Sequence, residues 1–331
     1  MKKFIALILS FVMIACLFAG CGEGAVQGGK DGLTLALVVA GNFGDRSFYD
    51  SSNAGATKLE EEGVTVKRIE CGNVGHTEQI YNAADVADIV VLVGWEFYDV
   101  EAVATEYPDK KFIWIDNATS APVANVLNIT YAQNEGSFLA GYVAAKLSET
   151  GVIGAMGGAD QDTINDFIVG YKQGALYANA DIQVEVIYSN DYDDPAIGKE
   201  CALTLHEKGA DVIFQIASKC GDGVFEAAQQ EGFYAIGVDA DQKYIAPQVI
   251  VCSMRKEVGD SIYYAVKEYM EKGDACELFG TTWVADMATG YVGLAYGEAG
   301  SVQQVSAELK VEVEELAKKI ISGEIKVDTT R

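Results

Sequence analysis

The chain has 331 residues, half of them hydrophobic, and a formal net charge of −25 from 49 acidic and 24 basic side chains. This acidity excludes nucleic acid and other polyanions as partners, because like charges repel. The length suffices for a large core and is close to the size at which chains divide into lobes.

The first twenty residues have the pattern of an export signal. Lys2 and Lys3 precede an apolar stretch over 4–18, which is shorter than the roughly 20 residues that a membrane-spanning helix needs. The following Ala19-Gly20-Cys21 resembles a bacterial lipobox, in which the signal is cut before a cysteine that is then lipidated, although Phe18 stands where such boxes usually carry leucine. The alternative is an ordinary signal peptide with an incidental cysteine.

We therefore expect a signal peptide over 1–20, and a lipidated Cys21 with a flexible, Gly-rich tether over 21–32. A palmitate-bearing cysteine would hold the chain on the extracytoplasmic face of the cell membrane, through the lipid anchor alone. Beyond Cys21, five cysteines follow at irregular spacing, which suggests neither a zinc site nor a disulfide framework. We interpret them as small buried hydrophobic residues.

From residue 33 onward, short apolar runs alternate with amphipathic stretches. The first half predicts strands over 33–40, 64–70, 88–93 and 111–115, and helices over 51–62, 77–86 and 98–106. After a break, the second half predicts strands over 152–156, 182–188, 211–216, 234–238 and 249–253, and helices over 134–148, 162–178, 195–208, 223–231, 256–272 and 311–321. This alternation is typical of parallel sheets covered by helices on both faces.

The pattern therefore predicts an α/β fold with two lobes, each a parallel sheet flanked by helices. We place the N-terminal lobe at 33–130 plus about 254–280, and the C-terminal lobe at 131–253 plus about 281–331. In such sheets ligands bind beyond the carboxyl ends of the strands. Two lobes that face each other there would form a cleft that closes by a hinge motion.

Polar or aromatic residues follow several predicted strand ends in the first lobe. Phe48, in the loop after the first strand, has two interpretations: core packing, or a stacking surface for a planar ligand. Ser47 or Asp50 can cap the helix that follows. Asp116 can simply end its strand or can accept hydrogen bonds from a ligand. Trp95 can add a ring to the cleft or pack in the core.

The second lobe offers a similar set. Asp239 and Asp241 follow one strand, and too few oxygen ligands lie nearby for a calcium loop. Gly221 precedes a helix whose backbone N–H groups can face an oxygen-rich ligand. Lys256 follows a further strand and can contact hydroxyl groups. The chain has two histidines and no G-x-S-x-G motif, so we expect no catalytic residue, metal or cofactor. The alternative is that Glu96 or the pair Asp239 and Asp241 acts as acid and base.

At these residues the chain resembles the basic membrane protein family of bacterial lipoproteins, which includes the purine-nucleoside receptor type. The resemblance covers the mature chain and rests on several segments in order: Asp45-Arg46-Ser47-Phe48, Tyr107-Pro108-Asp109 with Asp116, Glu135 to Gly141, Gly157-Gly158 with Phe167, Asp194 to Gly198, and Ile236 to Gln242 with Lys256. It implies a type I periplasmic-binding-protein fold and the role of a substrate-binding subunit that serves an ABC permease and ATPase.

The resemblance also implies a nucleoside ligand, purine favoured, captured by a monomer. The aromatic ring of Phe48 would stack on the base, Asp116 would bond the base, and Asp239 and Lys256 would hold the ribose. The family's usual Thr-Asp segment in the first loop is missing here, and Asn42 can substitute for it. The full set of expected ligand contacts is Asn42, Ser47, Phe48, Asp116, Phe167, Gly221, Asp239 and Lys256. Rival functions are the binding of a sugar or free base, a ligand sensor that feeds a receptor, and a nucleoside-processing enzyme.

Overall fold

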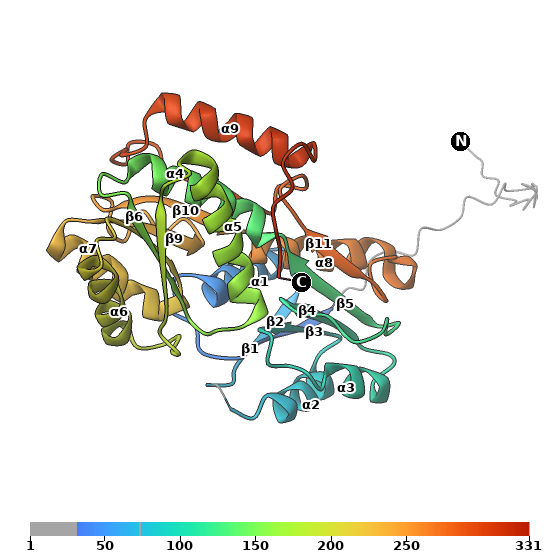
Figure 1. Ribbon diagram of the computed structural model, residues 1–331. Helices are drawn as coiled ribbons and strands as arrows, with labels where there is room; N and C mark the ends of the chain where they lie inside the picture. The colour runs from blue at the N-terminus through green and yellow to red at the C-terminus, as the bar shows by residue number, and fades with distance from the viewer. Residues whose placement is uncertain (1–31, 73, 331) are drawn as a thin grey trace, which may run out of the picture.

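The computed structural model describes residues 32–72 and 74–330, and in this part of the chain two lobes each contain a six-stranded sheet (Figure 1). The first sheet has the strand order β11-β5-β4-β3-β1-β2, and all its neighbouring strands are parallel. Its strands are β1 (Thr34–Val39), β2 (Thr65–Glu70), β3 (Ile89–Val93), β4 (Lys111–Ile115), β5 (Val126–Tyr131) and β11 (Thr282–Ala285). Its helices are α1 (Phe48–Glu61), α2 (His76–Val86), α3 (Val100–Glu106) and α8 (Val258–Lys272), with the short 3₁₀ helix η2 (Gly273–Ala275) after α8.

The second sheet has the order β12-β10-β9-β8-β6-β7, and only the edge strand β12 runs antiparallel to its neighbour. Its strands are β6 (Val152–Gly157), β7 (Gln183–Tyr188), β8 (Val212–Ile216), β9 (Tyr234–Asp239), β10 (Ile250–Lys256) and β12 (Val292–Ala295). Its helices are α4 (Gln133–Leu147), α5 (Asp162–Ala178), α6 (Pro195–Glu207), α7 (Asp222–Glu231) and α9 (Ala307–Ile321), with the 3₁₀ helix η1 (Ser218–Gly221) before α7. Helix α9 lies over α4 on the outside of this lobe (Figure 1).

The apolar strands are buried because helices cover both faces of each sheet. All five residues of β3 are fully buried, as expected for a central parallel strand. Leu37 and Val91 face the side covered by α1 and α8, whereas Val38 and Leu92 face α2 and α3. This alternation is the period of two that separates the faces of a strand. The five described cysteines are free and buried, which confirms their interpretation as small core residues.

Helices α4 and α5 pack closely because glycine lies at their contact. A Cβ on Gly141 would be 1.9 Å from the carbonyl oxygen of Tyr171, so only glycine allows this approach. Among the described residues, no helix combines the length and the apolar character needed to cross a bilayer. The expected signal, Cys21 and nearly all of the tether lie outside the described residues.

The sequence pattern does not predict three of the described strands, β5, β11 and β12. Asn128 and Thr130 interrupt the apolar pattern of β5, and the two edge strands have only four residues each. Because β10 belongs to the second sheet and β11 to the first, the last two crossings between the lobes fall between Lys256 and Val258 and between Ala285 and Val292. They come slightly later than the expected positions of about 254 and 281.

The two sheets repeat one topology. Reading both orders from the same end pairs β4 with β9, β3 with β8 and β1 with β6. The carboxyl ends of equivalent strands therefore hold equivalent places in the two lobes, and the loops after β4 and β9 become counterparts.

Candidate functional site

A cavity of about 600 Å³, including the solvent at its mouth, lies between the carboxyl ends of the two sheets. This volume is within the usual range for small-molecule sites. The lining comes from both lobes: Phe48, Tyr49, Gly94, Trp95, Glu96 and Asp116 from the first, and Gln161, Thr163, Ile164, Phe167, Tyr192, Ile216, Ser218, Val238, Asp239 and Lys256 from the second.

Two aspartates occupy equivalent strand ends in the cavity. Asp116 follows β4 with a φ of 72°, and Asp239 ends β9 with a φ of 63°. Left-handed backbone is uncommon for residues other than glycine, and it concentrates at functional sites where the surrounding structure holds it in place. Arg46 and Ser218, in the loops after β1 and β8, share this conformation. Three of the five described non-glycine residues with positive φ, Asp116, Ser218 and Asp239, thus line the cavity, whereas Arg46 and Asn190 do not.

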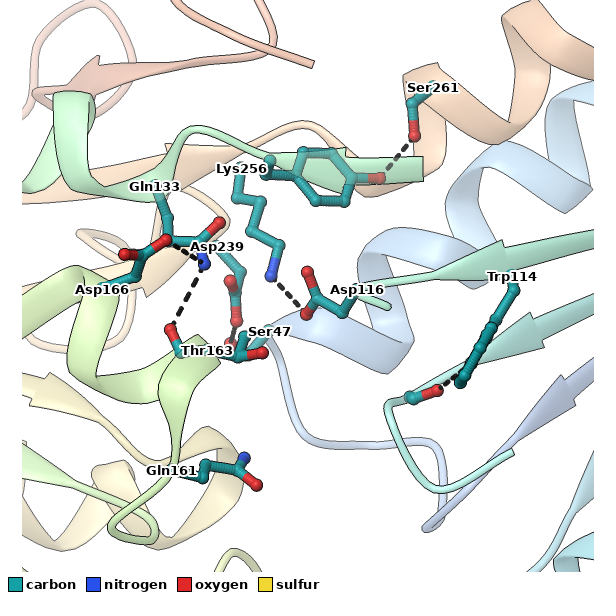
Figure 2. A network of polar contacts seen from close by, with 12 residues as sticks. Ser47, Trp114, Asp116, Gln133, Gln161, Thr163, Asp166, Asp239, Lys256 and Ser261 are labelled. Carbon is teal, nitrogen blue, oxygen red and sulfur yellow. Dashed lines mark hydrogen bonds and ion pairs between the residues drawn. The ribbon is translucent and has the colours of Figure 1, made fainter. Parts of the chain in front are cut away.

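Lys256 crosses the cavity from the second lobe toward the first (Figure 2). Its Nζ lies 2.5 Å from Oδ2 of Asp116, and the two side chains are only 2% and 8% exposed. The same ammonium lies 4.7 Å from the ring centroid of Phe48, 5.4 Å from that of Phe167 and 4.9 Å from that of Tyr131. A cation at this distance is attracted to a ring face. Aromatic rings from both lobes therefore surround the ammonium group. Such a ring cluster can stabilise a cation or a planar ligand group.

Asp239 is held by the other lobe. The hydroxyl of Ser47 donates to its Oδ2 at 2.6 Å (Figure 2). Burial raises the pKa of Asp239 to about 6, although the nearby Lys256 charge and the Ser47 hydrogen bond lower it. The carboxyl group therefore titrates just below neutral pH and accepts hydrogen bonds when it is ionised.

The start of α1 differs from the expectation that Ser47 or Asp50 caps the helix. Asp45 takes that role, since its carboxylate accepts the backbone N–H groups of Ser47, Tyr49 and Asp50 at 3.0–3.1 Å. The helix consequently begins at Phe48, three residues earlier than predicted. Ser47 is left free to reach Asp239. Ser218 of the second lobe also donates to Asp45, at 2.8 Å, so this cap ties the lobes together.

Further contacts join the loop after β1 to the second lobe. The guanidinium group of Arg46 pairs with the carboxylate of Asp222 at the start of α7. The amide of Gln242 donates to the backbone oxygen of Arg46 at 3.1 Å. The structure is therefore in a closed arrangement, with the loop after β1 held against the second lobe.

Glu96 also faces the cavity, from the loop after β3. Burial raises its pKa to about 7, and the Asp116 charge adds to this effect. On the opposite wall, the amide of Gln161 donates to the hydroxyl of Tyr192 at 3.1 Å. The sequence analysis does not single out Gln161 or Tyr192, because they lie in irregular loops without a period to read.

Most of the expected ligand contacts come together. Phe48, Asp116, Phe167, Asp239 and Lys256 line the cavity, as does Trp95, for which core packing was the alternative. Ser47 lies behind this lining and contacts it through Asp239.

Besides Ser47, two further expected contacts, Asn42 and Gly221, do not line the cavity. Asn42 is exposed in its loop. Gly221 is buried against Gln215, whose amide oxygen would lie 1.9 Å from a Cβ at that position. The glycine is thus explained by packing, and it offers no N–H group to the cavity. Among the described residues, no group of three or more His, Cys, Asp or Glu side chains is arranged to hold a metal ion.

Comparison with known proteins places this geometry in context. Residues 33–331 match the model of the Bmp family, described as PnrA-like ABC transporter substrate-binding proteins. Basic membrane protein A of Borreliella burgdorferi is 33% identical over 343 residues, which cover 100% of this chain and 97% of that protein. Basic membrane protein A2 of Borrelia garinii subsp. bavariensis is 33% identical over 330 residues, with 96% and 95% covered.

A solved structure agrees with these relatives. The solute-binding protein of an ABC transporter system from Aeropyrum pernix K1 superimposes with a TM-score of 0.81 at 28% identity, covering 90% of this chain and 94% of that one. The corresponding protein from Conexibacter woesei shares the fold, with a TM-score of 0.73, 24% identity, and coverage of 90% and 99%.

Proposed function

The chain belongs to the PnrA-like family of ABC transporter substrate-binding proteins, and from this premise we propose that it captures a nucleoside, with purines favoured, in the cavity between its lobes. The family and the fold are those of extracytoplasmic solute-binding proteins and not of enzymes. Its partners are accordingly a small-molecule ligand and the permease and ATPase of an importer. Capture involves closure of the lobes and no chemical step.

The observation that carries the nucleoside proposal is the surroundings of Lys256. Its ammonium lies near the ring faces of Phe48 and Phe167, which come from different lobes. A planar base inserted between these rings gains stacking on both faces. Lys256 would then withdraw toward the ribose side. Because the rings belong to opposite lobes, the sandwich forms only when the lobes close.

The polar groups support a ligand with hydroxyl and N–H groups and no negative charge. Asp116, Asp239 and Glu96 line the cavity together with a single lysine. A vicinal diol finds an acceptor in Asp239 and a donor in Lys256, as ribose hydroxyls require. A phosphate group would meet more acidic than basic side chains, so nucleotides should be rejected.

We further propose that the protein acts as a monomer held to the membrane by a lipid on Cys21. The motif Ala19-Gly20-Cys21 and the Gly-rich tether support this anchor, which would keep the binding lobes near the permease. Partition into detergent should be lost in a Cys21→Ala variant. A variant that still partitions with the membrane would contradict the lipid anchor.

The nucleoside proposal is tested by a thermal-shift and calorimetric panel on the purified mature chain. Guanosine, inosine, adenosine, uridine, guanine and ribose are compared with guanosine monophosphate. A ligand at 100 times its Kd should add about 2.7 kcal/mol to the free energy of unfolding. A shift with ribose or a free base alone would favour the sugar or base alternative. No shift with any nucleoside would overturn the proposal.

A further inference from the structure

Two buried acceptor atoms that belong to cavity-lining residues have no hydrogen-bond partner in the protein. They are Oε2 of Glu96 and Oδ1 of Asp116. Among the described residues they are the two unpartnered buried side-chain atoms that belong to cavity-lining residues. Leaving such a group unsatisfied is costly, so each calls for a donor that arrives from outside the protein.

The two carboxyl groups come from neighbouring strand ends. β3 and β4 pair in parallel, with Val93 opposite Ile115, so the loops that carry Glu96 and Asp116 begin side by side. The charge of Asp116 contributes to the raised pKa of Glu96, as expected for two acidic groups that share one wall. Together they make an acceptor edge on the first lobe.

The loop after β3 is built to hold Glu96 in this place. Gly94 has a φ of 132°, and a Cβ there would be 2.4 Å from Oε2 of Glu96. The indole N–H of Trp114 donates to the carbonyl oxygen of Gly94 at 2.8 Å (Figure 2), and this contact is buried. The side chain of Asn117 adds a weaker bond to the carbonyl oxygen of Trp95 at 3.4 Å. Gly94 therefore leaves space for the carboxylate of Glu96. The hydrogen bond from Trp114 of β4 holds the loop that contains Glu96.

We propose that Glu96 is a specificity-determining residue, which with Asp116 accepts N–H groups from one edge of the base and selects guanosine among the nucleosides. The inference rests on the proposed nucleoside function. Guanine presents N1–H and a 2-amino group on one edge, so it can satisfy both acceptors at once. Hypoxanthine lacks only the 2-amino group, and uracil offers a single N–H.

Residues 40–47, which form the first loop, supply no side chain to the cavity lining. The expected substitute for the family's missing aspartate, Asn42, is exposed and does not line the cavity. Glu96 supplies a carboxylate from the next strand in the sheet, since β3 adjoins β1. The acceptor is thus provided by a different loop of the same lobe.

Calorimetric titration of guanosine and inosine separates this role from a structural one. The wild-type protein should bind guanosine at least about 10-fold more tightly than inosine, because a buried charged acceptor would lack its donor with inosine. In Glu96→Gln and Glu96→Ala, guanosine affinity should fall by about 10- to 100-fold, while inosine affinity changes less than about 3-fold. Glu78→Gln, on the exposed start of α2, is the matched control.

Each outcome has a separate meaning. Equal loss of guanosine and inosine affinity, or no preference between them in the wild type, would overturn the role of Glu96 while leaving nucleoside binding intact. An absence of binding for every nucleoside would overturn the proposed function and this inference with it. Melting curves of the two variants without ligand check that a loss of affinity does not reflect misfolding.

Discussion

Neutralising Glu96 should make the ligand-free protein more stable at alkaline pH. The folded protein raises the pKa of this group from 4.5 to about 7, mainly through burial. Between those values the folded state binds more protons than the unfolded state, so stability falls as the pH rises through this window. Glu96→Gln removes the titrating group and therefore the loss.

The size of the effect follows from the shift. At about 1.4 kcal/mol for each pH unit, the change corresponds to roughly 3 kcal/mol, and partial solvent access reduces it to about 2 kcal/mol. For a chain of this length that is about 4 °C in Tm. Asp239 also titrates near pH 6, but it is present in both proteins and cancels in the difference.

Differential scanning calorimetry at pH 5, 6, 7 and 8 measures this difference. The variant and the wild type should melt within about 1 °C of each other at pH 5, and the variant should melt about 4 °C higher at pH 8. The exposed Glu78→Gln should follow the wild type at every pH. A Glu96→Gln variant that gains stability equally at pH 5 and pH 8, or that loses it at pH 8, would refute the reasoning.

Three further predictions address stacking, packing and closure. Phe48→Ala should raise the Kd for a nucleoside by about 10- to 100-fold in calorimetry, because a base loses one ring face; an unchanged Kd would remove Phe48 from the site. Gly141→Ala should cost about 3 kcal/mol in urea unfolding, since its Cβ would lie 1.9 Å from a carbonyl oxygen of α5, whereas Gly293→Ala meets no atom within 4 Å and should cost less than about 1 kcal/mol. Arg46→Ala breaks a partly exposed pair between the lobes, so stopped-flow release should quicken by less than about 5-fold; a larger change would mean that this pair controls closure.

The central strands were predictable from sequence because burial on both faces leaves them continuously apolar. β3 and β8 are examples, and every residue in them is buried. β11 was not predictable, since an edge strand of four residues, two of them exposed, lacks a detectable period. Its place in the first sheet depends on pairing with β5, a contact between residues more than 150 positions apart.

The candidate site was predictable where it follows strand ends. Asp116, Asp239 and Lys256 each lie at the end of a parallel strand, and the topology brings them to one cavity. Tyr192 reaches the cavity from a loop, and Gly221 is a glycine because of Gln215. Neither fact has a local signal, since both depend on contacts that form only when the chain is folded.

The equivalent positions of Asp116 and Asp239 have a consequence for unloading. Each lobe contributes a strand-end aspartate and a phenylalanine ring, Asp116 with Phe48 and Asp239 with Phe167, so the site is divided between the lobes. A ligand that contacts one lobe alone therefore contacts only one of the two aspartates and one of the two phenylalanine rings. We therefore expect that a permease which separates the two lobes releases the ligand by that separation alone, without a competing ligand or a covalent change. The rate of ligand release should then equal the rate at which the lobes separate.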